Sequence, residues 1–337
     1  MSCYNPLLAT QDIEENENGK HELIFHGKYT PERASAFEDP ILIPCGKCLG
    51  CRLDYSRAWA DRMMFELDHT GKGVFLTLTY NNAHVPIGML DNETELPLSY
   101  SLNKEDLQKF WKRLRKKFDD KELRYFACGE YGTNTFRPHY HAIVFGLSLA
   151  DLPDRTLIGT NELGQAYYRS QKIEEAWSIY HRATKTKEAY YDPIGFVLVS
   201  EVSWETCAYV ARYVMKKVDS PVKLFNEWRN CYPEFILSSR RPGIGAYYIS
   251  DHGLTFESDL QLYKSGRKIQ IPKFLLEKMA LTDPDGYDKL VQKRIEFAND
   301  KTMLELYQTD LDFEQLCELK EDQQYFRARQ LGRNKVR

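Results

Sequence analysis

Alternating apolar positions along the middle of the chain predict four strands. The strand expected at residues 74–80 is rich in β-branched and aromatic residues, and Thr77 and Thr79 place two hydroxyls on one of its faces. Two further runs are expected to form the arms of a β-hairpin, and the last run is apolar enough for a buried strand. These three strands are expected at residues 123–130, 139–145 and 194–202.

Apolar residues at helical spacing predict three helices around these strands. The clearest one follows Asn103, whose side chain can cap its N-terminus. Its apolar stripe consists of Leu107, Phe110, Trp111, Leu114 and Phe118. The other two helices are expected at residues 54–69 and 204–218, and residues 150–190 are expected to be an insertion with a short helix.

Composition narrows the class of protein without indicating its function. The 337 residues include 46 Lys and Arg against 49 Asp and Glu, and 42% of them are hydrophobic. These values, with a mean hydropathy of −0.55, are typical of soluble globular proteins and argue against a membrane-spanning, collagenous or wholly disordered chain. No secretory signal is expected at the N-terminus, and eight cysteines in a chain of this size do not indicate a disulfide scaffold.

The chain is expected to have three parts. Residues 1–72 form an N-terminal arm, loosely ordered over residues 1–44 and followed by a cysteine motif and a helix. Residues 73–220 form the core. Residues 221–337 are a mixed region, either separate or packed on the core.

Two histidines, His139 and His141, stand in the segment RPHYH on the second arm of the predicted hairpin. Because side chains alternate along a strand, both imidazoles point to one face, while Tyr140 points to the other. The hairpin also brings the Glu130 carboxylate toward them. Two imidazoles and a carboxylate leave open positions for water or substrate, which suits catalytic Mg²⁺ or Mn²⁺. The alternatives are ordinary surface histidines and a strand-end carboxylate.

The helix at residues 204–218 carries two tyrosines, Tyr209 and Tyr213, one turn apart on one face. Lys216 and Lys217 follow a turn later. A phenol has an ordinary pKa of about 10, and a nearby cation favours the nucleophilic phenolate. These residues therefore supply the groups needed for attack of a tyrosine on a metal-bound phosphodiester, although two half-buried rings would give the same spacing.

The segments FLTLTY, RPHYH and YVARYVMKK follow one another in the order and spacing of three motifs of HUH-type rolling-circle replication initiators. PCGKCLGCR upstream and SRRPGIG downstream narrow the likeness. The chain resembles the replication initiators of Microviridae, small phages with circular single-stranded DNA, in their gokushovirus branch. The resemblance covers most of residues 44–250. It implies an α+β fold with a central antiparallel sheet of the RRM or ferredoxin-like type, flanked by helices and extended at both termini.

The resemblance also implies an activity: a site-specific, metal-dependent DNA endonuclease and strand transferase. His139 and His141 match the metal ligands of the family, and Glu130 is our own inference for a third. Tyr209 and Tyr213 match its two-tyrosine motif, with Lys216 and Lys217 as catalytic cations. One tyrosine would attack the origin strand, leaving a 5′-phosphotyrosine and a free 3′-OH, and the other would act in the next round.

The partners implied by the resemblance are single-stranded and replicative-form DNA at the origin, with the host DNA polymerase and helicase. The expected location is the host bacterial cytoplasm, away from any membrane. Cationic side chains expected to contact DNA are Arg137, Lys109, Lys112, Arg113, Lys116, Arg240 and Arg241. For the helix at residues 103–118, a solvated basic face is the alternative, and Arg137 can either hold a phosphate oxygen or pair with an acid.

Cys45, Cys48 and Cys51 form a CxxCxxC motif. Three thiolates bind Zn²⁺ if a fourth ligand completes the site, and Cys3, Cys128 or a histidine are candidates. The alternative is a cluster of reduced thiols without metal. Two other functions also remain open: a non-catalytic origin-binding protein that recruits host replication factors, and a related HUH enzyme of transposition or conjugation.

Overall fold

The computed structural model describes residues 3–15, 21–132, 135–161, 164–216, 229–257, 259–262 and 268–333. The chain forms two compact units. We call residues 56–281 the central unit, and residues 1–55 with 282–337 the terminal unit. The helix α2 (Leu49–Thr70) belongs to the terminal unit in its first turns and to the central unit thereafter.

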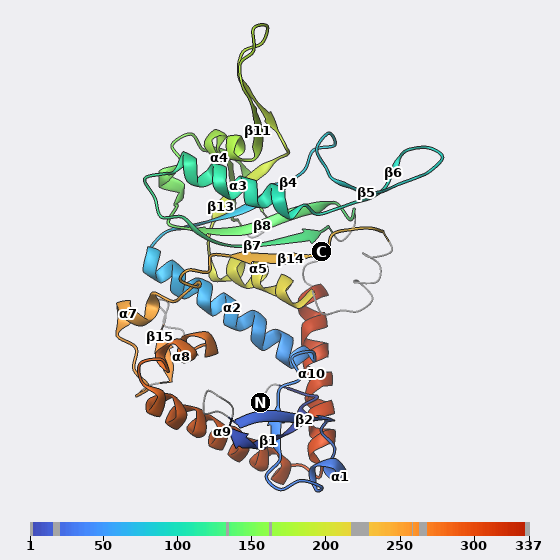
Figure 1. The fold of residues 1–337 in the computed structure, drawn as a ribbon, viewed down its shortest axis with the longest axis vertical. Coiled ribbons are helices and arrows are strands. Elements are labelled where there is room, and N and C mark those ends of the chain that lie inside the picture. The colour runs from blue at the N-terminus through green and yellow to red at the C-terminus, as the bar shows by residue number, and fades with distance from the viewer. Residues whose placement is uncertain are drawn as a thin grey trace. The chain divides into compact units, whose positions relative to one another are not determined.

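The central unit is built on one antiparallel sheet of seven strands in the order β14-β7-β8-β4-β13-β10-β9 (Figure 1). The strands are β4 (Gly73–Thr79), β7 (Arg124–Tyr131), β8 (Pro138–Phe145), β9 (Thr156–Thr160), β10 (Ala166–Arg169), β13 (Val197–Glu201) and β14 (Phe235–Ser238). The four strands expected from the sequence are therefore present. The insertion at residues 150–190 adds β9 and β10 to the edge of the same sheet.

Helices cover both faces of this sheet (Figure 1). One face packs against α3 (Lys104–Lys117) and α4 (Gln171–Ala176), with Tyr140, Trp111 and Trp177 in its core. The opposite face packs against α5 (Trp204–Lys216) and the second part of α2. Because successive side chains of a strand alternate between faces, each central strand serves both layers. The α+β fold with a central antiparallel sheet flanked by helices is thus confirmed.

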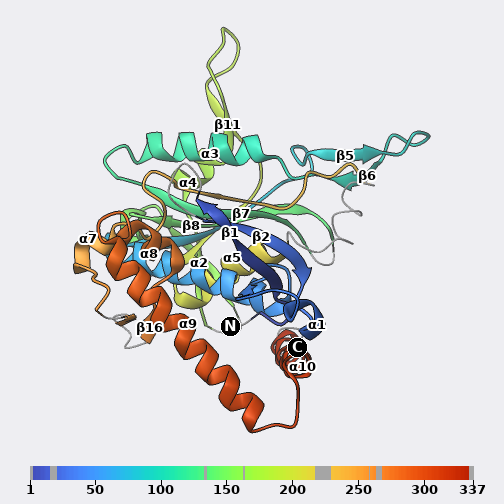
Figure 2. The ribbon, with the colours of Figure 1, turned by 60° about the horizontal axis from the view of Figure 1, so that its bottom comes forward.

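Shorter elements complete the central unit. Figure 2 shows two hairpins projecting from it, β5–β6 and β11–β12. Their strands are β5 (Ile87–Leu90), β6 (Pro97–Tyr100), β11 (Ser178–His181) and β12 (Tyr190–Pro193). The remaining elements are α7 (Tyr248–His252), β15 (Leu260–Leu262), β16 (Lys268–Gln270) and α8 (Lys273–Met279). Within the described part of the chain, none of the helices combines the length and the apolar character that crossing a membrane requires.

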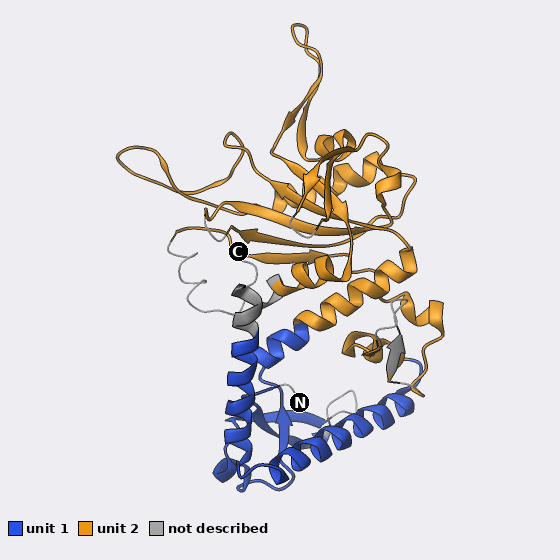
Figure 3. Ribbon diagram, turned by 180° about the vertical axis from the view of Figure 1, so that it is seen from behind, with its two compact units in different colours: residues 1–55, 282–337 blue, residues 56–281 orange. Residues whose placement is uncertain are grey.

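The terminal unit joins the two ends of the chain (Figure 3). It contains a three-stranded sheet in the order β2-β1-β3, the short helix α1, the start of α2, and two long helices. Their bounds are β1 (Leu7–Glu15), β2 (His21–Lys28), α1 (Pro31–Ala34), β3 (Ile41–Ile43), α9 (Pro284–Tyr307) and α10 (Phe313–Arg333). The expectation of a loosely ordered segment at residues 1–44 is wrong. Most side chains of β2 are exposed, so its sequence lacks the alternation that marks a half-buried strand.

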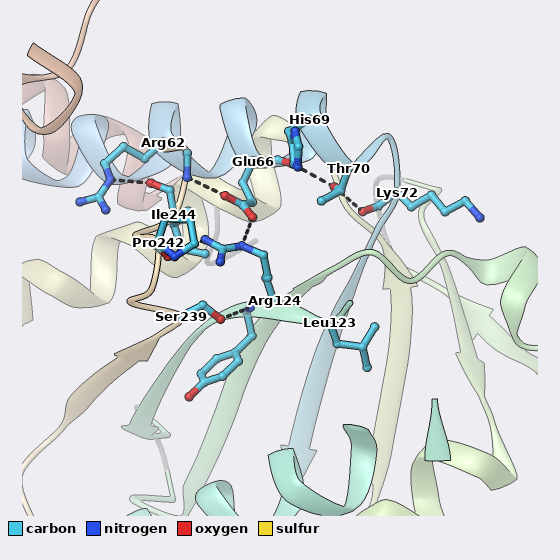
Figure 4. A network of polar contacts seen from close by, with 12 residues as sticks. Arg62, Glu66, His69, Thr70, Lys72, Leu123, Arg124, Ser239, Pro242 and Ile244 are labelled. Atoms are coloured by element: carbon cyan, nitrogen blue, oxygen red, sulfur yellow. Dashed lines mark hydrogen bonds and ion pairs between the residues drawn. The ribbon is translucent and has the colours of Figure 1, made fainter. Parts of the chain in front are cut away.

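A buried ion pair fixes one connection within the central unit (Figure 4). Arg124, at the start of β7, pairs with Glu66 of α2 and donates a hydrogen bond to the Pro242 carbonyl (2.8 Å). The Gly245 amide donates to the second Glu66 oxygen (2.6 Å). Gly245 has φ +80, and a Cβ atom there would lie 2.8 Å from the Arg62 carbonyl oxygen. The network therefore ties the segment after β14 to α2, and glycine is required at the closest approach.

Candidate functional site

The strand register places the two histidines and the glutamate on one patch of the sheet. In the β7–β8 hairpin, Glu130 is directly opposite His139, and in the neighbouring pair β4–β8, Thr77 is directly opposite His141. Directly opposed residues of an antiparallel pair project from the same face. Glu130, His139, His141 and Thr77 therefore share the face covered by α2 and α5.

The three side chains converge on a single point, and we call them the His–Glu cluster. Glu130 Oε1 lies 2.6 Å from His139 Nε2 and 3.0 Å from His141 Nε2. The Glu130 side chain is only 4% exposed. Burial by itself raises the pKa of this carboxyl, but the hydrogen bonds with the two histidines outweigh burial and lower its pKa to about 2. The buried carboxylate therefore stays ionised at neutral pH.

The second ring nitrogens of the histidines are also held. His139 Nδ1 lies 3.1 Å from the Arg137 carbonyl and donates to it, whereas His141 Nδ1 lies 3.0 Å from the Thr77 hydroxyl. A hydrogen bond at one nitrogen orients the ring and directs the other nitrogen to a metal ion. Because both Nε2 atoms face one carboxylate oxygen, the donor set fits a divalent cation with two nitrogen ligands and one oxygen ligand.

Tyr209 enters the same site from α5. Its hydroxyl lies 3.5 Å from His141 Nε2, and the two rings meet edge to face with centroids 5.2 Å apart. The start of α5 is fixed by reciprocal hydrogen bonds: the Ser203 amide donates to Thr206 Oγ1 (2.8 Å), and the Thr206 amide donates to Ser203 Oγ (3.3 Å). Cys207, Val210 and Ala211 anchor the helix on the sheet. The helix therefore presents the Tyr209 phenol to the His–Glu cluster.

The remaining residues of the tyrosine motif lie at or beyond the described end of this helix. Tyr213 and Lys216 belong to α5, but the structure does not describe their side chains, and Lys217 lies outside the described residues. The part of the predicted site that the structure brings together is thus the His–Glu cluster with Tyr209.

Tyr140 points into the opposite layer, as the alternation of the strand predicts. It is fully buried, and its hydroxyl donates to the Asn103 carbonyl (2.8 Å) and accepts from the Asn103 amide (2.9 Å). Its hydroxyl also lies 2.7 Å from that of Tyr80. Burial raises the pKa of Tyr140 well above its usual range. This tyrosine joins the start of α3 to the strand that carries the histidines, and it is no nucleophile.

The predicted DNA-contacting cations fall into separate groups. Arg137 donates to Asn82 Oδ1 (3.0 Å) and to the Tyr80 carbonyl (3.1 Å), so it braces the β7–β8 loop against the end of β4. The basic residues of α3 lie in the layer opposite the His–Glu cluster, and among them Arg113 donates to the Ala176 carbonyl (2.6 Å). The other α3 cations are Lys109, Lys112 and Lys116. Arg240 and Arg241 are exposed on the segment after β14.

The cysteine motif lies in the terminal unit. Cys45, Cys48 and Cys51 are joined there by Cys3, and the four sulfur atoms lie within 4.8 Å of one another. Cys128, another candidate for the fourth ligand, is buried in β7 of the central unit and faces α5. The four residues Cys3, Cys45, Cys48 and Cys51 are called the cysteine cluster below.

Two positions of the His–Glu cluster carry functions that the sequence did not assign. The Thr77 hydroxyl holds His141, and the Arg137 carbonyl holds His139. The alternation of the first strand did place the Thr77 hydroxyl on one face, but only the register of β4 with β8 identifies its partner. A backbone carbonyl leaves no signal in a sequence at all.

Comparisons with known proteins agree with this architecture. Residues 73–218 match the family of replication-associated proteins of the ORF2 type, a range that begins with β4 and ends just after α5. The chain is 29% identical over 307 residues to the replication-associated protein ORF2 of Spiroplasma virus 4, covering 87% of this chain and 86% of that protein. It is 27% identical over 295 residues to the replication-associated protein VP4 of Bdellovibrio phage phiMH2K, covering 85% and 80%. No solved structure matches the chain.

The fold and the His–Glu cluster define an α+β protein with a candidate metal site, whose sheet also positions a tyrosine. The core of the chain, residues 73–218, belongs to the ORF2-type family of replication-associated proteins, which confirms the predicted resemblance to replication proteins of small phages. A role in DNA replication follows from this membership, and with it DNA as the partner.

Proposed function

We propose that the chain initiates rolling-circle replication of a small phage genome by nicking the origin strand with a tyrosine. The observation that carries this proposal is the meeting of three metal-ligand side chains with a phenol. Glu130, His139 and His141 converge within ligand distance, and the Tyr209 hydroxyl lies 3.5 Å from His141 Nε2. A purely structural histidine pair gives no reason for a helix to deliver a phenol to the same point.

The His–Glu cluster would hold Mg²⁺ or Mn²⁺, with His139 and His141 as nitrogen ligands and Glu130 as the oxygen ligand. When bound, such an ion polarises the scissile phosphate and offsets the charge that develops during attack. Glu130 contributes a fixed negative charge, because its pKa of about 2 keeps it ionised. Thr77 and the Arg137 carbonyl hold the two imidazoles in place.

Tyr209 is the nucleophile placed by the described residues. Its oxygen forms a bond to phosphorus as the bond from phosphorus to the 3′ oxygen breaks. The phenol loses one proton and the leaving 3′ oxygen gains one, so the products are a 5′-phosphotyrosine and a free 3′-OH. Tyr213, one turn further along α5, would act as the second nucleophile in the following round, with Lys216 and Lys217 favouring the phenolates.

The same proposal extends to the partners. Single-stranded and replicative-form DNA at the origin would be the substrates, with phosphates contacted by Arg240, Arg241 and the basic residues of α3. The free 3′-OH would prime the host DNA polymerase, a host helicase would open the duplex, and the reaction would take place in the bacterial cytoplasm.

The experiment is a nicking assay with labelled single-stranded oligonucleotides that tile the phage genome. Full-length protein is expected to cut one of them in Mg²⁺ or Mn²⁺, to leave a product that stays attached in denaturing gels, and to stop in EDTA. The matched control is Tyr209→Phe combined with Tyr213→Phe, which is expected to bind DNA without cutting it. Salt-sensitive binding with no covalent product in any metal would instead identify a non-catalytic origin-binding protein.

A further inference from the structure

The cysteine cluster draws its four members from two separate stretches of the chain. Cys3 precedes β1, Cys45 follows β3, and Cys48 and Cys51 stand at the start of α2. All four are free thiols rather than disulfides. The Sγ atoms of Cys3 and Cys48 are 3.9 Å apart, and none of the four sulfurs lies more than 4.8 Å from another.

These separations are those of sulfurs around a single ion. With a metal–sulfur bond of about 2.3 Å, the edge of a tetrahedron of sulfurs is about 3.8 Å long. In a four-iron cluster, by contrast, each cysteine binds a different iron atom, so its sulfurs surround a much larger object. The compact arrangement therefore fits a mononuclear site.

The backbone around the sulfurs is also arranged for thiolates. The amides of Lys47 and Cys48 point to Cys45 Sγ (3.4 and 3.3 Å), and the Tyr4 amide points to Cys48 Sγ (3.4 Å). The Cys45 amide donates to Cys3 Sγ (3.2 Å). Amide donors stabilise a negative charge on sulfur and fix its direction. The tight turn between Cys45 and Cys48 is made possible by Gly46, with φ +72.

We propose that Cys3, Cys45, Cys48 and Cys51 bind one Zn²⁺ ion in a closed, four-thiolate structural site. Zinc favours four tetrahedral thiolate ligands in such sites, with no position left for water or substrate. Cys3 is the fourth ligand, and it lies 42 residues before Cys45 in the chain. The ion is independent of the His–Glu cluster and of any nicking activity.

The position of the site indicates what the ion does. It joins the segment before β1 to the start of α2, where Glu321 of α10 already accepts hydrogen bonds from the Asn5 side chain (3.0 Å) and the Leu49 amide (3.4 Å). The N-terminal segment, α2 and α10 therefore meet around the cysteine cluster. Because the unfolded chain has no preformed site, the binding free energy of the ion adds to the folding free energy of the terminal unit.

The test is elemental analysis of the full-length protein purified without chelators. One zinc per chain is expected, and the same content is expected in Cys231→Ala, which removes a cysteine outside the cluster. His139→Ala with His141→Ala should also retain one zinc, which separates this site from the His–Glu cluster. Cys3→Ala and Cys48→Ala are each expected to lose at least tenfold in zinc retained after dialysis. Iron in place of zinc, or no metal with the four thiols free or oxidised, would overturn the proposal.

Cobalt substitution tests the fourth ligand directly. Co²⁺ in the apo-protein is expected to give thiolate charge-transfer bands and the intense visible bands of a tetrahedral site, with intensities set by four sulfurs. If Cys3→Ala fails to fold, Cys3→His is the second variant, since imidazole can replace a thiolate at zinc. It should fold, bind Co²⁺ and shift the spectrum to that of three sulfurs and one nitrogen. An unchanged spectrum in either variant would remove Cys3 from the site.

Discussion

The two clusters of metal-ligand side chains in this chain are built in contrasting ways. The His–Glu cluster stands on adjacent strands of the central sheet, has three protein ligands, and lies against a phenol. The cysteine cluster gathers four thiols from segments outside the strands and is ringed by backbone amides. An ion held by three ligands keeps positions for substrate, whereas four thiolates complete a tetrahedron. The first arrangement suits chemistry and the second suits folding.

The largest expected effect concerns the open site. Replacing His139 and His141 together by Ala removes both nitrogen ligands, so we expect nicking to fall at least about 10³-fold, because metal assistance contributes several kcal/mol to the transition state. The measurement is the initial rate on the origin oligonucleotide in Mn²⁺. His181→Ala, which changes a half-exposed histidine elsewhere in the central unit, is the control and should cut normally. A double variant that cuts within tenfold of the parent would break the comparison.

The next effect concerns stability in the central unit. Glu66→Ala leaves the Arg124 guanidinium buried without its carboxylate, so we expect the free energy of unfolding to fall by about 3–5 kcal/mol. Denaturant unfolding followed by fluorescence measures it. Adding Arg124→Leu should restore part of the loss, because the second change removes the uncompensated charge. A loss below about 1 kcal/mol, the range of exposed pairs, would show that this connection is not held by the ion pair.

A smaller effect separates metal positioning from metal ligation. Thr77→Val removes the hydroxyl at His141 Nδ1 with little change in volume, so we expect Mn²⁺ affinity to fall about 10–100-fold. Titration calorimetry measures the affinity. The matched control is Thr79→Val on the same strand face, because that hydroxyl bonds to the Phe196 carbonyl instead. Equal losses in the two variants would mean that the strand, rather than the hydrogen bond, sets the affinity.

The smallest effect is expected at an exposed pair of the terminal unit. Lys28 and Glu314 lie 3.3 Å apart with half-exposed side chains, so Lys28→Met should change the free energy of unfolding by less than about 1 kcal/mol. Thermal unfolding of the zinc-loaded protein measures it. A larger loss would show that ion pairs, and not the cysteine cluster, hold the terminal unit together.

The sequence predicted the central unit well because its signals are local and regular. The strands β4, β7 and β8 are buried on both sides, and a period of two residues places His139 and His141 on one face without knowledge of the fold. The hairpin then brings Glu130 opposite His139. Each step needs only neighbours in the sequence or a single turn.

What the sequence did not predict depends on distant or backbone contacts. Cys3 was one of several candidates, because pairing a residue near the N-terminus with Cys45 requires the whole β1–β3 sheet. That sheet was missed since β2 is mostly exposed and shows no clear alternation. The edge strand β9 was missed for the same reason, as most of its residues are exposed.

The central claim is that a phenol on α5 attacks DNA beside the His–Glu cluster, and mass spectrometry of the protein–DNA product tests it most directly. After reaction with the origin oligonucleotide and digestion, a 5′-phosphate linkage is expected on Tyr209 or Tyr213, in Mg²⁺ or Mn²⁺ only, and not in the double histidine variant. A linkage on any other residue, or cleavage that leaves no nucleotide attached to the protein, would contradict the account.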